Sequence, residues 1–134
     1  MSWNITSMGE FHDPRQILSG RRILIVEDEA LVAMMIEDFL TDLGCQIIGP
    51  VSNAEDALGL IRETALDGAT LDINLGSEEV LPVAEALEAQ GVPFMIISGY
   101  DRENVRSRYN KWPIIQKPFT SNSLAEGLVR LVGR

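Results

Sequence analysis

The chain has 134 residues, the size of one ordinary domain, so a second globular unit is not expected. Eleven basic and twenty acidic residues give a net charge of −9, which argues against nucleic acid or an anionic membrane surface as the main partner. One Cys and one His allow neither an internal disulfide nor a Cys/His zinc cluster, and no apolar run approaches the roughly 20 residues of a membrane span. We therefore expect a soluble, cytoplasmic protein.

Across residues 20–134, short apolar runs alternate with helical patterns, and we take this stretch as one domain. The apolar runs predict five strands, at residues 23–26, 45–51, 69–73, 94–97 and 113–116. The patterns that follow them predict five helices, which end near residues 43, 64, 90 and 108 and close to the C-terminus. Such an alternation is typical of an α/β fold, in which helices cover both faces of a parallel sheet.

Local signals indicate where some of these helices begin. Ser52 and Glu55 have the Ser-x-x-Glu spacing of a capping box before the second helix. Pro82 is tolerated best in the first turn of a helix, so the third helix is expected to start near residue 80. The fourth helix, at residues 101–108, has few apolar positions, and it is therefore expected to be weak and mobile.

Residues 1–19 lie outside the alternation and form an N-terminal extension. Asp13 followed by Pro14 has the form of a helix N-cap with proline at the first helical position. The extension is either a frayed tail or a packed extra helix that uses Trp3 and Phe11, and the sequence leaves both interpretations open.

Polar and charged side chains follow several of the predicted strands. In an open α/β sheet, ligands bind in the crevice at the carboxyl ends of the strands. The residues at those ends are Glu27, Asp28, Asp72, Ser98 and Lys117. Taken singly, most have an ordinary structural explanation: an acidic pair can start a helix, Ser98 can begin a turn, and Lys117 can be an exposed strand end. Asp72 is harder to explain in this way, because a carboxylate among apolar neighbours needs a partner or a metal.

Three carboxylates that converge at one edge of a sheet require a cation. Two like charges about 4 Å apart repel by about 4 kcal/mol at an effective dielectric near 20, so such a site would destabilise the fold or take up protons. Lys117 supplies one positive charge, and a hard divalent ion with oxygen ligands is the natural source of the rest. Because Mg²⁺ suits such a site and commonly serves phosphate chemistry, these residues predict a phosphoryl-transfer site.

Four motifs follow one another along the chain, each at the end of a predicted strand. They are Ile25-Val26-Glu27-Asp28-Glu29, Leu71-Asp72-Ile73-Asn74-Leu75, Ile97-Ser98-Gly99-Tyr100 and Gln116-Lys117-Pro118-Phe119. With these motifs, the sequence from about residue 21 onward resembles the receiver domain of bacterial two-component response regulators. The resemblance implies a flavodoxin-like α/β fold, with a five-stranded parallel sheet in the strand order 2-1-3-4-5 and helices on both faces. It also implies a stand-alone, phosphoryl-accepting signalling protein of a phosphorelay.

The resemblance assigns roles to the acidic residues. It implies that Asp72 accepts the phosphoryl group and becomes an acyl phosphate. Asp28 and Asp72 would bind Mg²⁺ directly, together with the backbone carbonyl of Asn74. Glu27 would act on the metal mainly through a water molecule.

The same resemblance assigns roles to two residues beside the phosphoryl group. Ser98 would donate a hydrogen bond to one phosphoryl oxygen, and Lys117 would pair with another. The peptide bond between Lys117 and Pro118 is expected to be cis. Both side chains would act on charge that spreads over the phosphoryl oxygens in the transition state.

The position that often holds a switching aromatic residue in receivers, three residues before the lysine, is Ile114 here. The candidate substitute is Tyr100, within a stretch at residues 93–100 that is similar to Pro-Phe-x-Phe-Ala-Thr-Gly-Tyr in a subgroup of stand-alone receivers. Ordinary packing over the fourth helix is the alternative role for Tyr100.

Tyr109 and Trp112, before the fifth strand, are either isolated surface aromatics or part of a partner interface.

The implied phosphate donor is a histidine kinase or a histidine phosphotransfer protein, since His12 lies in the extension with no helical bundle around it. Output would pass to a downstream protein through the face of the fourth helix and fifth strand, or the protein would act as a phosphate sink. We expect a monomer or a phosphorylation-dependent dimer, and no turnover of an external substrate. Two alternatives stay open: a receiver-like interaction module that is not phosphorylated, and a phosphatase of the haloacid dehalogenase type, which would need an acid at Asn74.

Overall fold

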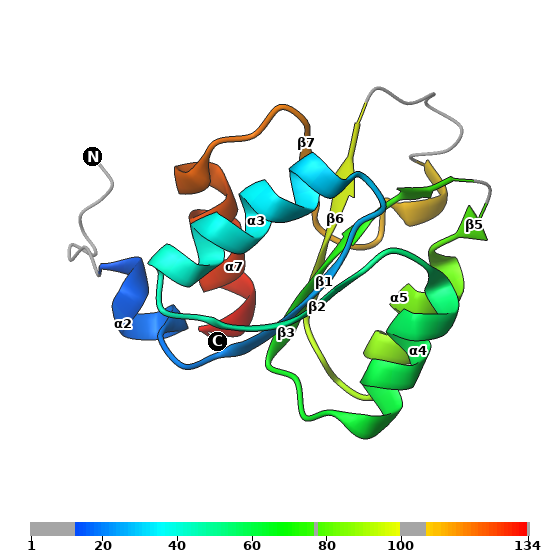
Figure 1. The fold of residues 1–134 in the computed structure, drawn as a ribbon, viewed down its shortest axis with the longest axis horizontal. Helices are drawn as coiled ribbons and strands as arrows, with labels where there is room; N and C mark the ends of the chain where they lie inside the picture. The colour runs from blue at the N-terminus through cyan, green and yellow to red at the C-terminus, as the bar shows by residue number, and fades with distance from the viewer. Residues whose placement is uncertain (1–12, 77, 100–106, 134) are drawn as a thin grey trace.

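The core of the protein is a parallel β-sheet (Figure 1). The computed structural model describes residues 13–76, 78–99 and 107–133. The strands of the main sheet are β1 (Arg22–Val26), β2 (Gln46–Val51), β3 (Gly68–Asp72), β6 (Phe94–Ser98) and β7 (Ile114–Gln116). They lie in the order β2-β1-β3-β6-β7, and each pair of neighbours is parallel. In order along the chain this is 2-1-3-4-5, so the predicted fold class and strand order are confirmed.

Helices cover both faces of the sheet (Figure 1). One face is packed by α3 (Ala30–Asp42) and α7 (Ser121–Val132), and the other by α4 (Ala54–Glu63) and α5 (Leu81–Ala89). A 3₁₀ helix, η1 (Ser107–Tyr109), precedes β7. Within the described part of the chain, no helix has both the length and the apolar character needed to cross a membrane.

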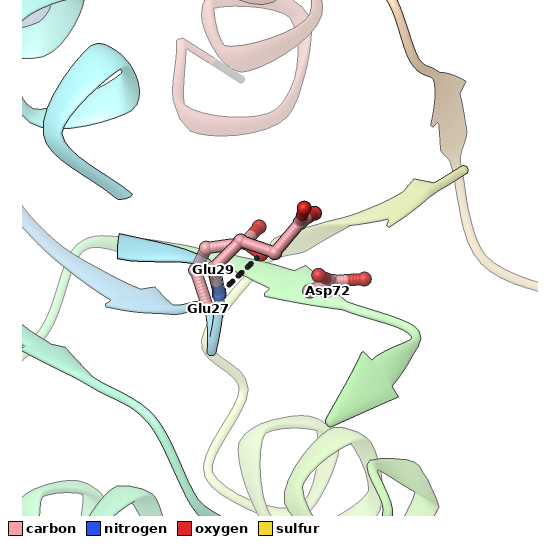
Figure 2. Close-up of side chains that lie close together, drawn as sticks. All are labelled: Glu27, Glu29 and Asp72. Atoms are coloured by element: carbon pink, nitrogen blue, oxygen red, sulfur yellow. Dashed lines mark hydrogen bonds between the residues drawn. The ribbon is translucent and has the colours of Figure 1, made fainter. Parts of the chain in front are cut away.

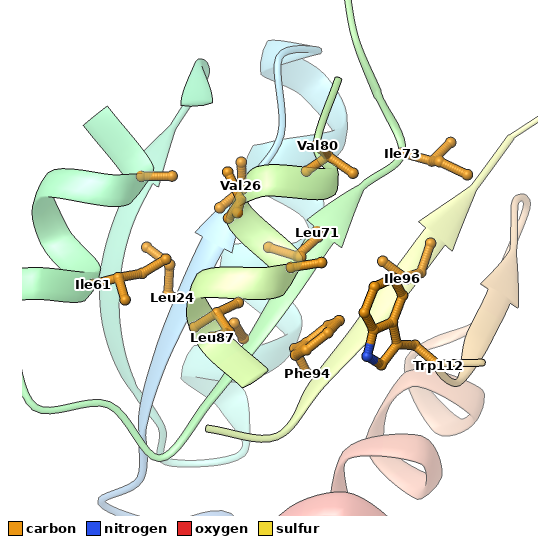
Figure 3. Packing of buried hydrophobic residues seen from close by; sticks show 14 of the residues in the cluster. Leu24, Val26, Ile61, Leu71, Ile73, Val80, Leu87, Phe94, Ile96 and Trp112 are labelled. Carbon is orange, nitrogen blue, oxygen red and sulfur yellow. The ribbon is translucent and has the colours of Figure 1, made fainter. Parts of the chain in front are cut away.

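The alternation of side chains along β1 explains why the sheet separates two apolar clusters. Leu24 and Val26 belong to the cluster beneath α4 and α5, which Figure 3 shows, whereas Ile23 and Ile25 belong to the cluster beneath α3 and α7. The central strand β3 is buried along its whole length, as expected of a parallel strand covered on both faces. A charged residue on such a strand is tolerated best at its end, and Asp72 is the last residue of β3.

Helix α2 (Pro14–Leu18) packs against α7. Asp13 caps it, because its Oδ1 accepts a hydrogen bond from the backbone N–H of Arg15 at 3.0 Å, and the following proline is the first helical residue, as predicted. Leu18 is fully buried in the cluster beneath α3 and α7. Trp3 and Phe11, the aromatic residues of the extension, lie outside the described residues. The division of the chain into extension and domain stays a prediction.

Tyr109 and Trp112 are core residues, so the expectation of surface aromatics is wrong. Both are almost fully buried, and the ring of Trp112 lies 5.4 Å from that of Phe94 between centroids (Figure 3). The indole N–H of Trp112 donates a hydrogen bond to Glu88 Oε2 at 3.3 Å. Their burial was hard to predict because a loop before a short strand has no periodicity from which an inward direction can be read.

The cap of α4 is Asn53 rather than Ser52, so the predicted capping box is wrong. Asn53 Oδ1 accepts a hydrogen bond from the backbone N–H of Asp56 at 2.8 Å, and Ser52 is exposed before the helix. Ser and Asn are about equally good N-cap residues, and the chain offers them at adjacent positions. Sequence preference alone therefore could not distinguish between them.

Asn53→Ala is expected to lower the free energy of unfolding by about 1 kcal/mol, because a backbone N–H at the start of α4 loses its acceptor. The matched control, Ser52→Ala, should leave the free energy of unfolding within about 0.5 kcal/mol of the wild type. Urea denaturation followed by circular dichroism measures both values. An equal or larger loss for Ser52→Ala would contradict the observed cap.

Candidate functional site

Three strands bring charged side chains to one edge of the sheet. The last residue pair between the parallel strands β1 and β3 is Val26 with Leu71, so Glu27, which follows β1, lies beside Asp72. Lys117 follows β7, and its backbone N–H donates to the carbonyl of Ser98 at the end of β6. Parallel pairing therefore gathers residues that are far apart in the sequence at the carboxyl ends of the strands.

Glu27, Glu29 and Asp72 form an acidic cluster at this edge, and Figure 2 shows their side chains close together. One carboxylate oxygen from each residue lies within 4.8 Å of the other two. Glu27 and Asp72 are each 2% exposed, whereas the Glu29 side chain is 64% exposed. The backbone N–H of Glu29 also donates to Glu27 Oε2 at 3.2 Å, which fixes the turn between β1 and α3 (Figure 2).

Lys117 is the cation that faces the acidic cluster. Its Nζ lies 3.0 Å from Glu29 Oε1, 3.2 Å from Asp72 Oδ2 and 3.7 Å from Glu27 Oε2. The two shorter contacts are hydrogen bonds from the ammonium group. Among the described residues, one ammonium group faces three carboxyl groups, which leaves this part of the edge short of positive charge.

The shortage of positive charge shifts the protonation of Glu27. Burial, together with the hydrogen bond and the charge of Asp72, raises the pKa of Glu27 to about 8, although Lys117 and a backbone hydrogen bond oppose the shift. Burial alone would lower the pKa of Lys117, but the hydrogen bond to Glu29 and the charges of Asp72 and Glu27 raise it. Near neutral pH, the metal-free site therefore holds a proton on Glu27 and a charged ammonium group on Lys117.

The acidic cluster has the chemistry of a site for a hard divalent cation. Glu27 Oε1 is buried and has no hydrogen-bond partner, which is uncommon for a carboxylate oxygen in a folded protein. The neighbouring ligand atoms are carboxylate oxygens, which Mg²⁺ prefers. A cation here, directly or through a bound water, would satisfy Glu27 Oε1 and replace the charge of the proton on Glu27, so the residues present fit such an ion.

The predicted site residues do not all converge. Glu27, Asp72 and Lys117 meet at the edge of the sheet. Asp28 is exposed and is not among the three carboxyl groups of the acidic cluster. Its Oδ2 would lie 3.7 Å from a Cβ atom added at Gly76, so Asp28 lies next to the turn that follows β3.

The loop after Asp72 forms a short hairpin that the sequence did not predict. It consists of β4 (Asn74–Leu75) and β5 (Glu78–Glu79), which pair antiparallel. Two-residue strands carry no hydrophobic period, so a sequence pattern could not reveal them. The backbone N–H of Asn74 donates to Asp72 Oδ1 at 2.9 Å, which holds one oxygen of Asp72 in place.

Ser98 and its neighbours lie beside Asp72 at the end of β6. Ser98 is fully buried, and its hydroxyl donates a long hydrogen bond, 3.5 Å, to the carbonyl of Gly99. The Lys117-Pro118 peptide bond is cis, as the resemblance to receiver domains implies. The switch candidate Tyr100 and residues 101–106 of the predicted fourth helix lie outside the described residues.

Glu29 is a site residue that sequence reasoning missed. A search for polar strand ends does not select it, because it occupies the N-cap position of α3. Its side chain makes no capping hydrogen bond and instead accepts one from Lys117. The sequence held one signal for this residue: three acidic residues, Glu27, Asp28 and Glu29, follow β1 in a row.

A cavity of about 260 Å³ lies away from this edge, between the end of α5 and the residues before β7. Its described lining is mostly apolar and includes Phe94 and Trp112. Glu88 is the one ionisable side chain in that lining, and it already accepts a hydrogen bond from Trp112. Because functional pockets combine apolar walls with convergent polar groups, the acidic edge is the better candidate site.

The raised pKa of Glu27 gives the metal-free protein a defined pH dependence. The stability that comes from the Glu27 proton is complete below the ordinary pKa of 4.5 and is lost as the pH rises through about 8. In the presence of EDTA, the melting temperature of the wild type should fall across this interval, and Glu27→Gln should flatten the fall because its side chain stays neutral. The control Glu85→Gln, at an exposed position of α5, should keep the wild-type slope. Identical slopes for wild type and Glu27→Gln would contradict the assignment.

Comparison with known proteins agrees with the geometry. The family model described as the response regulator receiver domain matches residues 23–128. The protein-glutamate methylesterase/protein-glutamine glutaminase of Archaeoglobus fulgidus is 30% identical over 121 residues, which cover 83% of this chain and 35% of that protein. The chain spans about a third of the length of this relative and less than two thirds of the length of other curated relatives.

Solved structures share the fold. SdrG from Sphingomonas melonis Fr1 is 44% identical, with a TM-score of 0.73 over 84% of this chain and 95% of that chain. SdrG from Pseudomonas melonis Fr1, described in a BeF3-activated conformation, is 44% identical, with a TM-score of 0.70 over 83% and 95%. The receiver domain of the sensor histidine kinase PA1611 from Pseudomonas aeruginosa PAO1, with magnesium in its active-site cleft, has a TM-score of 0.77 over 87% and 100%, and at 22% identity it shows the fold alone. The family match, which covers most of the sequence, shows that this chain belongs to the response regulator receiver domain family.

Proposed function

We propose that the protein is a phosphoryl-accepting receiver of two-component signalling, phosphorylated on Asp72 by a histidine kinase or a histidine phosphotransfer protein. The observation that carries the proposal is the position of Asp72. Its carboxylate ends the central strand, is almost fully buried, and accepts a hydrogen bond from Lys117 at 3.2 Å. An oxygen held in one place beside an ammonium group is positioned for attack on a phosphorus atom.

In the proposed step, a carboxylate oxygen of Asp72 attacks the phosphorus of a phosphohistidine. A P–O bond forms to give an acyl phosphate, the N–P bond breaks, and the imidazole nitrogen leaves with the electron pair and takes up a proton. Charge spreads over the phosphoryl oxygens in the transition state, so positioning and electrostatic stabilisation supply most of the catalysis. Lys117 would pair with one of these oxygens, and Ser98 would donate a hydrogen bond to another.

The proposed Mg²⁺ ligands are Asp28, Asp72 and the backbone carbonyl of Asn74, with Glu27 acting through water. When bound, the ion supplies positive charge against the phosphoryl oxygens. The unpartnered Glu27 Oε1 supports a cation at this edge of the sheet. The magnesium ion in the active-site cleft of the PA1611 receiver domain supports it by analogy.

The proposed output is a protein–protein contact, without turnover of an external substrate. The signal would pass to a downstream protein through the face of the fourth predicted helix and β7, with Tyr100 as the switch candidate, or phosphorylation would serve as a phosphate sink. The protein would act as a monomer or as a phosphorylation-dependent dimer. The net charge of −9 favours protein partners over nucleic acid and membranes. The buried thiol of Cys45, whose pKa burial raises to about 11, fits the reducing cytoplasm.

Asp72→Asn is expected to abolish phosphorylation, because the amide cannot form an acyl phosphate. Intact mass spectrometry after incubation with acetyl phosphate and Mg²⁺ should show one added phosphoryl group on the wild type and none on Asp72→Asn. Asp38→Asn, an exposed substitution on α3, is the matched control and should gain the phosphoryl group like the wild type. An unmodified wild type, or a modified Asp72→Asn, would sink the phosphoacceptor assignment and favour the interaction module.

Asp28→Asn is expected to weaken Mg²⁺ binding at least about tenfold, or about 1.4 kcal/mol, because a direct carboxylate ligand loses its charge. Isothermal titration calorimetry on the unphosphorylated protein measures this change without any phosphate donor. Asp38→Asn again serves as the control for the change in net charge. Wild-type affinity in Asp28→Asn would remove Asp28 from the ligand set and leave the acidic cluster alone as the metal site.

A further inference from the structure

The Glu29 carboxylate makes the shortest of the three contacts to Lys117. The distance from Nζ is 3.0 Å to Glu29, 3.2 Å to Asp72 and 3.7 Å to Glu27. Glu29 differs from the other two acids in exposure, since its side chain is 64% exposed while theirs are nearly inaccessible. The Lys117 ammonium group is therefore shared between Asp72, which is buried, and Glu29, which is exposed to solvent.

The Glu29 side chain makes no capping hydrogen bond to its own helix. It occupies the N-cap position of α3, where a side-chain oxygen usually accepts a backbone N–H, yet it makes no such hydrogen bond. The carboxylate accepts instead from the ammonium group of Lys117, 88 residues away in the sequence. The contact therefore acts on Lys117 rather than on the start of α3.

The hydrogen bonds of Lys117 set up a competition. An ammonium group has three N–H donors and no acceptor, and two of its donors are directed at Glu29 and Asp72. A phosphoryl group on Asp72 adds anionic oxygens near the same ammonium group. Only one N–H donor lies outside these two hydrogen bonds, so pairing with the phosphoryl oxygens through more than one donor requires Lys117 to weaken its contact with Glu29 or with Asp72.

We propose that Glu29 is a positioning residue that holds the Lys117 ammonium group in the unphosphorylated protein and competes with the phosphoryl group for it. The inference rests on the proposed function, because it assumes that Lys117 serves a phosphoryl anion on Asp72. Glu29 sets how readily Lys117 transfers to that anion. Since the Glu29 contact is largely exposed, its effect on anion affinity should be small, about two- to fivefold.

Two substitutions separate loss of the contact from loss of charge. Glu29→Gln removes the charge and the ion pair together. Glu29→Asp keeps the charge but shortens the side chain by one methylene, so that the carboxylate no longer reaches Lys117. Glu85→Gln, at an exposed site on α5, is the control for net charge.

The test uses beryllofluoride, an inorganic mimic of the phosphoryl group, titrated into each full-length variant at a Mg²⁺ concentration that saturates that variant. Fluorine NMR reports the bound fraction. Glu29→Gln and Glu29→Asp should both bind beryllofluoride about two- to fivefold more tightly than the wild type, and Glu85→Gln should match the wild type. Tighter binding by Glu29→Gln alone would assign the effect to charge repulsion and overturn the proposal, as would unchanged or weaker binding by both variants.

A second readout needs neither metal nor phosphate mimic. The ¹⁵N resonance of Lys117 Nζ in the metal-free protein should shift in both Glu29 variants and stay in place in Glu85→Gln, because only the Glu29 substitutions change the charge or the position of the acceptor that faces Nζ. An unshifted resonance overturns the proposal. If the wild type binds no beryllofluoride, the proposed function fails and the inference fails with it. If the wild type binds and the Glu29 variants do not differ from it, the inference fails and the proposed function stands.

Discussion

The arrangement of the site depends on a shortage of positive charge at the carboxyl ends of β1, β3 and β7. Lys117 faces three carboxyl groups, two of which are buried where water cannot screen them. The protein meets this shortage by raising the pKa of Glu27 so that it takes up a proton, and by directing the Lys117 ammonium group between Asp72 and Glu29. A divalent cation would add positive charge to this edge and a phosphoryl group would add negative charge, so either would change its balance of charge.

The sheet keeps these groups together against their mutual repulsion. β3 lies between β1 and β6 and is buried on both faces, so the position of Asp72 is set by packing along the whole strand. The apolar clusters on the two faces supply the hydrophobic free energy that offsets the cost of burying two acids. This edge of the sheet is therefore buried at Asp72 and open to solvent at Glu29.

The fold could be predicted because the central strands are nearly continuous apolar runs, and a parallel sheet needs strands of that kind. Ligands bind at the carboxyl ends of the strands in such a sheet, and this rule identified Glu27, Asp72 and Lys117, which meet in the structure. Several details could not be predicted, and three of them have different physical reasons. Asn53 and Ser52 are equivalent as caps, the burial of Trp112 depends on tertiary packing, and the contact of Glu29 with Lys117 joins segments that no local pattern connects.

The burial of Trp112 has a practical consequence for observing this molecule. Its indole ring touches Phe94 of β6, donates to Glu88 at the end of α5, and lies beneath the Lys111 ammonium group at 4.7 Å. Two separate elements and the neighbouring Lys111 therefore contribute to the polarity and the electric field around one chromophore. Intrinsic fluorescence, with Trp3 replaced by Phe, would follow rearrangements of the segment before β7 in real time without an attached dye.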